Sequence, residues 1–288
     1  MKKVFLFLLV IITINVFAQD DLVVKKVEYP AGYESKIDAV YSEIGDWKGR
    51  EDIYYNPTAE KPTPIVFNIH GGGWNHGVKE SQTGYGSFFK LGYAVANIEY
   101  RMTGQATAPA AIEDVRAAIL YVVQHAKEFN IDPNYIVVMG GSAGGHLALM
   151  AGLLQNDNKF DGAYKIVTRY NIKAIIDKYG PTDLSMPEFA KYKSLVAWLG
   201  AQAENIKFRE SVSPIFYVKK NSPPIFIVHG DADPVVPYQQ SILLKDKLEK
   251  LGVKNVFLSM PGGGHGKFTP EQKSELSAAI ITFLKGLK

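Results

Sequence analysis

Near the middle of the chain stands the glycine-rich sequence Gly140-Gly141-Ser142-Ala143-Gly144-Gly145. An apolar run over residues 135–139 precedes it and predicts a buried strand, and the pattern of residues 143–154 predicts a helix. A G-x-S-x-G motif between a strand and a helix is typical of a nucleophile elbow, a tight and strained turn that needs small flanking residues. Ser142 is therefore the predicted nucleophile. Taken alone, the motif is also compatible with a turn that cradles phosphate.

A second glycine-rich motif, His70-Gly71-Gly72-Gly73-Trp74, directly follows another predicted buried strand over residues 64–69. Attack of a serine on a carbonyl creates an oxyanion, whose charge needs donors that are already in place. Glycines let backbone N–H groups point into a cavity, and the N–H after the nucleophile completes such a set. We therefore predict an oxyanion hole formed by Gly72, Gly73 and Ala143.

Chain order identifies the general base, because sites of this type run from serine to acid to histidine. Three histidines follow Ser142. His146 lies one helical turn further on and is expected to pack on its helix, and His229 ends a predicted strand. His265 lies in a glycine-rich loop, and a general base needs such a loop to reach the serine. A lone loop histidine is often functionless, but its position in the chain makes His265 the predicted base.

The acid is expected in the loop over residues 230–237, where Asp231 and Asp233 both qualify. A carboxylate there would hold the imidazole in the correct tautomer and stabilise the imidazolium. Asp233 is preferred, with Asp231 as a turn-forming residue. A metal site that also uses His229 is the alternative, but these are few ligands on one short loop. No metal and no cofactor is therefore predicted.

The rest of the pattern alternates buried strands with helices, which predicts an α/β fold with a mostly parallel sheet of about eight strands and helices on both faces. The opening residues 22–29, 37–44 and 50–55 read as strands without intervening helices, so we expect antiparallel pairing at one edge. Residues 184–222 lack a strand pattern and are predicted to form a small cap or lid within a single domain over residues 19–288. The other predicted strands are 93–98, 174–179, 225–229 and 253–259, and the other helices are 108–129, 242–251 and 270–287.

The first residues read as a targeting segment. Lys2 and Lys3 precede an apolar run over residues 4–12, and small or aliphatic residues stand at 16 and 18. This pattern predicts a signal peptide over residues 1–18 that is removed after export. A membrane anchor is the alternative, but the run is shorter than the roughly 20 residues that span a bilayer. We therefore expect a secreted or periplasmic protein without stable membrane insertion after cleavage.

Composition excludes several classes. Of 288 residues, 47% are hydrophobic, which is typical of a globular chain. The 32 basic and 29 acidic residues give a net charge of +3, with no basic stripe, so no nucleic-acid partner is predicted. Because cysteine is absent from the sequence, disulfides and a lipoprotein anchor are excluded.

Together these motifs resemble the α/β-hydrolases related to hormone-sensitive lipase, and within them the bacterial feruloyl-esterase-like (BD-FAE) carboxylesterases. The resemblance extends over nearly all of residues 19–288 and implies the α/β-hydrolase fold, a serine–histidine–aspartate triad, and Asp233 as its acid. The residues that carry it are 70–74, 99–101, 109–116, 130–133, 140–145, 179–184, 229–237 and His265.

Two departures from that family's pattern bear on the substrate. The position before the serine is usually acidic, and here it is Gly141. No long helical cap precedes the first strands. Both features favour a small esterase with an open site, and both argue against long-chain lipid substrates. Trp74 is predicted to line that site, although a tryptophan is also often a core residue.

Three functions follow from this reading. The preferred one is a serine carboxylic-ester hydrolase that removes acetyl or feruloyl groups from small-molecule or oligosaccharide esters through an acyl-enzyme. The second is an exopeptidase or amidase of the same fold, although such peptidases usually carry an additional β-propeller domain, for which this chain is short. The third is a non-catalytic binding protein on a hydrolase scaffold. Such proteins typically lack a triad member, whereas all three are present here.

Overall fold

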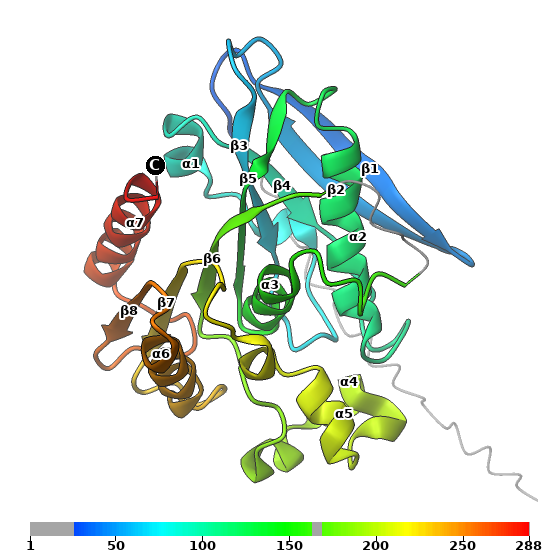
Figure 1. Cartoon of the computed structure of the whole chain (residues 1–288), viewed down its shortest axis with the longest axis vertical. Helices are drawn as coiled ribbons and strands as arrows, with labels where there is room; N and C mark the ends of the chain where they lie inside the picture. Colours follow the sequence, from blue (N-terminus) through cyan, green and yellow to red (C-terminus); the bar gives the residue numbers. More distant parts are fainter. Residues whose placement is uncertain (1–25, 163–168, 288) are drawn as a thin grey trace, which may run out of the picture.

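The computed structural model describes residues 26–162 and 169–287, so the predicted signal peptide lies outside the described residues. A single eight-stranded sheet runs through the described chain in the order β1-β2-β4-β3-β5-β6-β7-β8 (Figure 1). The pairs β1–β2 and β2–β4 are antiparallel and all others are parallel. The strands are β1 (Glu34–Ile44), β2 (Trp47–Tyr55), β3 (Thr63–Ile69), β4 (Ala94–Ile98), β5 (Ile131–Gly141), β6 (Ile172–Lys178), β7 (Ile225–Gly230) and β8 (Asn255–Met260).

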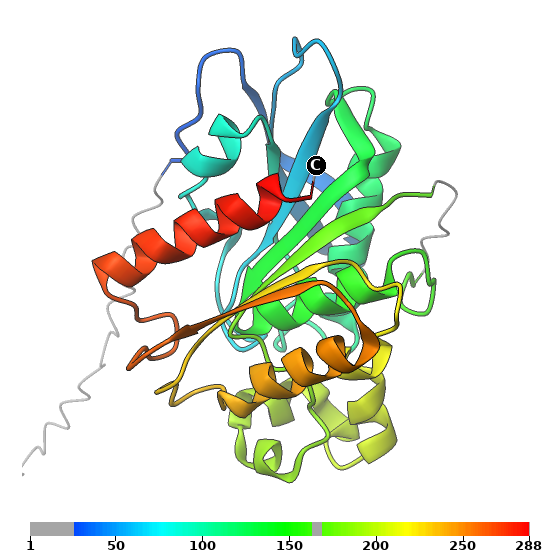
Figure 2. The same cartoon turned by 60° about the vertical axis from the view of Figure 1, so that its left-hand side comes forward.

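Helices cover both faces of this sheet. Apolar side chains of α2, α3 and α6 form one core with the sheet, and those of α1 and α7 form a second core on the opposite face. Figure 2 shows α7 lying along the strands. The α-helices are α1 (Gly86–Lys90), α2 (Ala110–Gln124), α3 (Ala143–Leu154), α4 (Lys193–Leu199), α5 (Ile206–Ser211), α6 (Gln239–Leu251) and α7 (Pro270–Lys285).

The central strands are apolar on both sides because helices cover both of their faces. Strands β4 and β7 are buried at every residue, and β3 at all but one. Continuous apolar runs are typical of such doubly covered parallel strands, and this is why they stand out in the sequence. The predicted mostly parallel α/β fold with about eight strands is confirmed.

The register of the parallel strands brings their carboxyl ends to one level. The loops that follow β3, β5, β6, β7 and β8 therefore begin side by side at the same edge of the sheet, although they are far apart in the chain. The pairs that set this level are Ile69 with Gly140, Gly141 with Lys178, Lys178 with Val228, and Gly230 with Met260.

The predicted strand over residues 22–29 is wrong where the structure describes it, because residues 26–29 form no strand. Val27 is buried in the core beside α7, and the ring of Tyr29 lies 5.5 Å from that of Tyr54. The alternating pattern there reflects packing against the sheet without strand pairing, although the Tyr29 hydroxyl lies 3.2 Å from that of Ser35 in β1. The antiparallel edge consists of two strands, β1 and β2.

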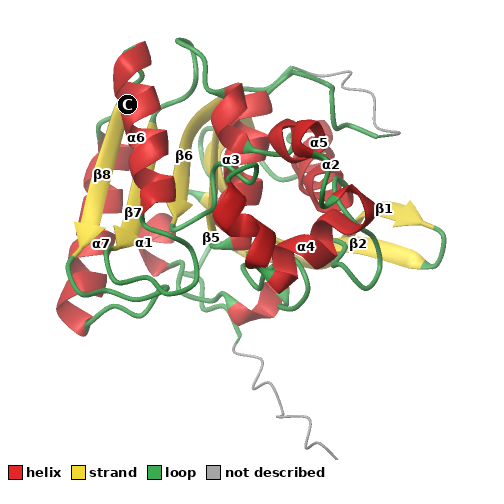
Figure 3. Ribbon diagram, turned by 90° about the horizontal axis from the view of Figure 1, so that it is seen from below, coloured by secondary structure: helices red, strands yellow, loops and turns green. Residues whose placement is uncertain are grey.

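The segment predicted as a cap, residues 184–222, contains α4, α5 and three short 3₁₀ helices: η2 (Pro187–Lys191), η3 (Gly200–Gln202) and η4 (Pro214–Tyr217). Figure 3, seen from below, looks onto α4 and α5, which Figure 1 places at the lower end of the molecule beyond α3. One further 3₁₀ turn, η1 (Lys79–Ser81), follows β3. The short helix α1 was not predicted, since five residues carry too little periodicity.

Candidate active site

The turn between β5 and α3 holds Ser142 in a strained conformation. Its φ and ψ are 57° and −124°, a region that non-glycine residues rarely adopt and that is found mainly at functional sites. The backbone N–H of Ser142 donates to the Lys178 carbonyl of the neighbouring strand at 2.9 Å. The turn is therefore anchored on the sheet with the serine raised at its carboxyl edge, as the elbow motif predicts.

Close packing explains two glycines around the serine. A Cβ on Gly140 would lie 2.1 Å from the Gly144 carbonyl oxygen. A Cβ on Gly144 would lie 2.1 Å from the carbonyl oxygen of Ile69 at the end of β3. Any side chain at either position would push α3 away from the strands. The glycines in the motif thus allow the nucleophile turn, α3 and the end of β3 to meet.

Three side chains from separate loops form one hydrogen-bonded chain. Nε2 of His265 lies 2.8 Å from Oγ of Ser142, and its Nδ1 lies 2.7 Å from Oδ2 of Asp233. A carboxylate only accepts, so Nδ1 carries the proton and Nε2 is left to accept from the serine hydroxyl. This is the tautomer that a general base requires. The structure therefore brings together the three residues that the sequence predicts as nucleophile, base and acid.

The Asp233 carboxylate is held by four donors. Its Oδ1 accepts from the N–H groups of Val235 and Val236 at 2.7 and 3.0 Å, and its Oδ2 lies 3.2 Å from Nε2 of His229 in addition to His265. Burial opposes ionisation of this fully covered side chain, but the hydrogen bonds from His229, His265 and the two amides outweigh it. The pKa of Asp233 is therefore held well below its usual range, and the group is a permanent anion beneath His265.

His229 is a contributor that the sequence reasoning missed. It is fully buried, its Nε2 also donates to the Val236 carbonyl at 3.0 Å, and its Nδ1 lies 2.7 Å from the Ser241 hydroxyl. The signal available was its position as the penultimate residue of β7, directly before the loop that carries the acid. Asp231, the other acid considered, accepts from the Gly262 N–H at 2.6 Å and so ties its loop to the one that carries His265.

The oxyanion-hole candidates Gly72, Gly73 and Ala143 all lie in the wall of the cavity that contains Ser142. The Gly72 carbonyl accepts from the N–H groups of Asn75 and His76 at 3.0 and 3.1 Å, which folds the loop into a compact turn. Gly71 packs directly on the elbow, since a Cβ there would lie 2.8 Å from the Gly141 carbonyl oxygen.

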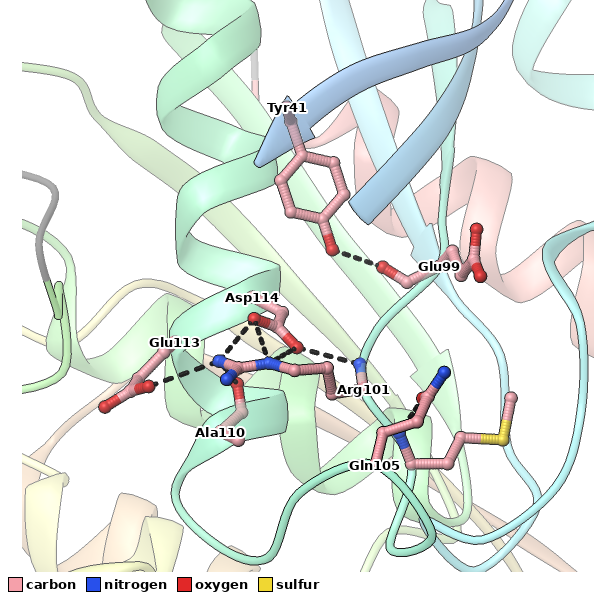
Figure 4. Close-up of polar contacts among 8 residues, drawn as sticks. Tyr41, Glu99, Arg101, Gln105, Ala110, Glu113 and Asp114 are labelled. Atoms are coloured by element: carbon pink, nitrogen blue, oxygen red, sulfur yellow. Dashed lines mark hydrogen bonds and ion pairs between the residues drawn. The ribbon is translucent and has the colours of Figure 1, made fainter. Parts of the chain in front are cut away.

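The oxyanion loop rests on the loop that follows β4. Thr103 donates to the Trp74 carbonyl through both its N–H and its hydroxyl, at 2.8 and 3.0 Å, and the Tyr100 hydroxyl donates to the His70 carbonyl at 3.1 Å. Arg101 fixes this supporting loop, because its guanidinium and its N–H both donate to the buried Asp114 of α2 at 2.7 to 3.0 Å (Figure 4). An ion pair between this loop and α2 therefore contributes to the shape of the site.

Gly141, the departure from the family pattern, faces Tyr179. A Cβ on Gly141 would lie 3.1 Å from the Tyr179 hydroxyl oxygen and 3.3 Å from its ring. The tyrosine has a φ of 48°, and its ring lies 4.8 Å from that of His265. The ring of Tyr179 thus occupies the space that an acidic side chain at position 141 would need, and it forms the wall beside His265.

The cavity above Ser142 has a volume of about 600 Å³. The cap segment supplies one wall through Phe189, Tyr192, Ser194 and Leu195. Trp74 also belongs to the wall, as predicted, but it is only 4% exposed, and its ring stacks on Trp198 of α4 at 4.7 Å. The tryptophan therefore shapes the wall mainly by packing against the cap.

His146 lies behind this wall and packs on its helix, as predicted. Its ring meets those of Trp74 and Trp198 edge-on at 5.2 and 5.3 Å, and its Nε2 donates to the Val212 carbonyl at 2.8 Å. Burial lowers the pKa of His146 to about 4, despite the hydrogen bond to Val212. This histidine joins α3 to the cap as a neutral group.

The part of the chain over residues 26–162 and 169–287 holds no group of three or more His, Cys, Asp or Glu side chains arranged to bind a metal ion. No helix in it is long and apolar enough to cross a membrane.

A serine, a histidine and an aspartate joined in this way above a G-x-S-x-G turn form the arrangement that is typical of serine hydrolases with the α/β-hydrolase fold. A family model, BD-FAE, matches residues 51–248. The chain therefore belongs to the BD-FAE family, an α/β-hydrolase family of esterases. The predicted family is confirmed.

Relatives of known name agree with this assignment. Esterase LipC of Mycobacterium tuberculosis is 32% identical over 216 residues, which are 72% of this chain and 53% of LipC. The probable carboxylic ester hydrolase LipM of the same organism is 30% identical over 229 residues, which are 76% of this chain and 53% of LipM. The chain spans about half the length of the curated relatives it matches.

Solved structures match over a larger share. A truncated form of a carbohydrate esterase from gut microbiota has a TM-score of 0.77 and 31% identity, covering 89% of this chain and 98% of that one. An acetyl ester-xyloside bifunctional hydrolase from Caldicellulosiruptor lactoaceticus has a TM-score of 0.73 and 28% identity, covering 84% of this chain and 89% of that one.

Proposed function

We propose that this protein is a carbohydrate esterase that removes short acyl groups, such as acetyl or feruloyl, from small-molecule or oligosaccharide esters. The observation that carries the proposal is the chain of two hydrogen bonds, 2.8 and 2.7 Å long, that joins Ser142 to His265 and His265 to Asp233. The named structural relatives, a carbohydrate esterase and an acetyl ester-xyloside hydrolase, support the substrate class.

The proposed reaction follows from this arrangement. Oγ of Ser142 attacks the ester carbonyl while Nε2 of His265 takes the hydroxyl proton, and the same nitrogen then returns it to the leaving alcohol. Water cleaves the acyl-enzyme by the same route. Asp233, already an anion, stabilises the imidazolium that forms in each half-reaction. The N–H groups of Gly72, Gly73 and Ala143 are the proposed donors to the oxyanion, each such donor being worth roughly 10²–10³ in kcat.

The shape of the cavity supports an accessible ester rather than a long lipid. The wall from the cap consists of short helices, and the deeper space behind Trp74 is filled by Trp198 and His146. Tyr179 narrows the side next to His265. The space behind Trp74 is therefore closed to a long aliphatic chain, which favours a short acyl group on that side of the cavity.

Hydrolysis of 4-nitrophenyl acetate and of an acetylated xylo-oligosaccharide tests the proposal. Wild-type protein is expected to cleave both esters, and Ser142→Ala is expected to cleave neither above background. Ser211→Ala is a matched control, because that hydroxyl donates to the Phe208 carbonyl in α5, away from the cavity. Activity retained in pure Ser142→Ala protein would overturn the proposed nucleophile, and faster cleavage of aminoacyl anilides than of esters would favour a peptidase.

We also propose that the protein is exported and that residues 1–18 are removed. The support is the sequence alone: a basic start, an apolar run over residues 4–12, and small or aliphatic residues before the expected cleavage point. Amino-terminal sequencing of the protein from the periplasm or medium of an expressing bacterium tests this. A mature protein that starts at Gln19 is expected, and an intact amino terminus in the cytoplasm would contradict it.

A further inference from the structure

Lys178 stands beside the nucleophile but has no part in the proposed reaction. It is the last residue of β6, and its carbonyl accepts the N–H of Ser142. Side chains alternate along a strand, and Ala174 and Ile176 belong to the core on the α1 and α7 face. The side chain of Lys178 therefore leaves the sheet on that face, opposite Asp177, whose carboxylate lies against α3.

A second cavity of about 220 Å³ lies on this face between α1 and α7. Lys178 and Gln82 line both this cavity and the one that contains Ser142, so the two residues form the boundary between them. The walls of the second cavity are largely apolar, with Phe88 and Leu91 on one side and Ile280 on the other. A substrate held at Ser142 has a side space next to it with a cation at its entrance.

The charged side chains that line the two cavities are lysines. Lys178 and Lys273 line the second cavity, and neither cavity has an Asp or Glu among the described residues of its wall. The Lys178 ammonium also has no hydrogen bond or ion pair with any residue in the described part of the chain. Burial lowers the pKa of Lys178 to about 8, so the group is still mostly protonated at neutral pH.

Burying a cation without a counter-charge costs free energy, and an anionic ligand offsets this cost by supplying the missing charge. At the boundary between the two cavities, the donors are the Lys178 ammonium and the Gln82 side-chain amide. This small set suits a carboxylate better than a phosphate, whose three oxygens call for several donors. The apolar walls suit the carbon skeleton that carries the carboxylate.

We propose that Lys178 is the centre of an anion-binding subsite, which makes the enzyme prefer esters that carry a carboxylate close to the scissile bond. This inference rests on the proposed esterase function. The carboxylate belongs either to the acyl part, as in a dicarboxylic half-ester, or to the alcohol part, as in an acetylated uronic acid. The chemistry at Lys178 is the same in both cases.

Two matched pairs of esters test the subsite. Ethyl hydrogen succinate is compared with ethyl butanoate for the acyl part, and an acetylated methyl glucuronoside with the corresponding acetylated methyl glucoside for the alcohol part. The readout is the ratio of kcat/KM for the anionic ester to that for the neutral one. A hydrogen bond to a charged group predicts a ratio of about 10 or more for one pair in the wild type.

In Lys178→Met that ratio is expected to fall to about 1, and Lys178→Arg is expected to restore most of it, since the charge returns. Lys173→Met, at the other end of β6, is the control and is expected to keep the wild-type ratio. Ratios near 1 for both pairs in a wild type that hydrolyses the neutral esters would overturn the subsite and leave the proposed function intact. If no ester in the panel is hydrolysed, the proposed function fails and the subsite fails with it.

If Lys178→Met folds poorly, competitive inhibition of the wild-type enzyme tests the subsite instead. Methyl glucuronoside or succinate is expected to inhibit hydrolysis of 4-nitrophenyl acetate competitively, at least tenfold more strongly than methyl glucoside or butane-1,4-diol. Equal inhibition by the anionic and neutral compounds would also overturn the proposal.

Discussion

Two histidines close to Ser142 have opposite surroundings. His265 comes from a loop, is 19% exposed at its side chain, and lies between a hydroxyl and a carboxylate. His146 stands one helical turn after the serine, is fully buried, and packs against Trp74 and Trp198. The same side chain is thus placed to move a proton in one position and to fill space in the other.

The difference lies in the groups that would surround a positive charge on each ring. An imidazolium on His265 meets the Asp233 anion, whereas one on His146 would meet two indole rings and a single carbonyl. Burial without a counter-charge keeps His146 neutral. Nearness to the nucleophile in sequence therefore says less about catalysis than the partners on both ring nitrogens.

The largest expected effect is at His265. His265→Ala removes the proposed base, so kcat/KM for 4-nitrophenyl acetate is expected to fall by about 10⁶-fold. His146→Phe is the paired variant and is expected to lose less than about tenfold, since only packing changes. Steady-state kinetics on both proteins, with circular dichroism to verify folding, makes the comparison. Equal losses in the two variants would remove the distinction between the histidines.

Asp233→Asn is expected to cost about 10⁴-fold in kcat/KM, because an amide permits the wrong tautomer of His265 and leaves the imidazolium without an anion. Asp231→Asn supplies the control, since the amide oxygen still accepts from the Gly262 N–H. A loss of kcat/KM in Asp231→Asn that equals or exceeds the loss in Asp233→Asn would show that Asp233 is not the triad acid.

The aromatic cluster around His146 is expected to affect the free energy of unfolding more than kcat/KM. Trp198→Ala leaves a void between Trp74 and His146 and should lower the free energy of unfolding by about 3–5 kcal/mol. Urea denaturation measures this loss. The account is contradicted if unfolding is unchanged, or if kcat/KM of the folded variant falls as far as in Asp233→Asn.

The smallest effect concerns pH. The pKa of His146 is about 4 in the folded protein against 6.5 as its ordinary value, so the unfolded chain binds this proton more readily. The stability contributed by neutral His146 is complete above about pH 6.5 and is lost as the pH falls toward 4, by up to about 3 kcal/mol. Urea denaturation of wild type and His146→Phe at pH 7.5 and 4.5 measures this contribution, because only the wild type has a histidine at position 146 to titrate. An identical loss of stability in both proteins would contradict it.

Much of the fold and the three central site residues could be predicted because each depends on a local signal. Doubly buried strands give continuous apolar runs, and Ser142 and Asp233 lie in loops that directly follow such strands. His265 lies in the glycine-rich loop after the partly exposed edge strand β8. Parallel register then brings those loops to one edge, so order along the chain was enough to choose between three histidines.

The remaining features depend on contacts between loops and could not be predicted in the same way. The contact from His229 to Asp233, which adds to that from His265, depends on the path of the loop after β7. The position of Tyr179 beside Gly141 depends on the backbone conformation at the end of β6. The burial of Trp74 depends on where α4 lies. Side-chain packing between distant segments leaves no periodic signal in a single sequence.

The central claim, that the bonds to His265 activate Ser142, is tested most directly by labelling with a phosphorylating organophosphate. Wild-type protein treated with paraoxon is expected to gain one diethylphosphoryl group by intact-mass spectrometry, mapped to Ser142 after digestion, whereas Ser142→Ala gains none and His265→Ala reacts far more slowly. A label on another residue, or no label on a protein that still hydrolyses esters, would contradict the account.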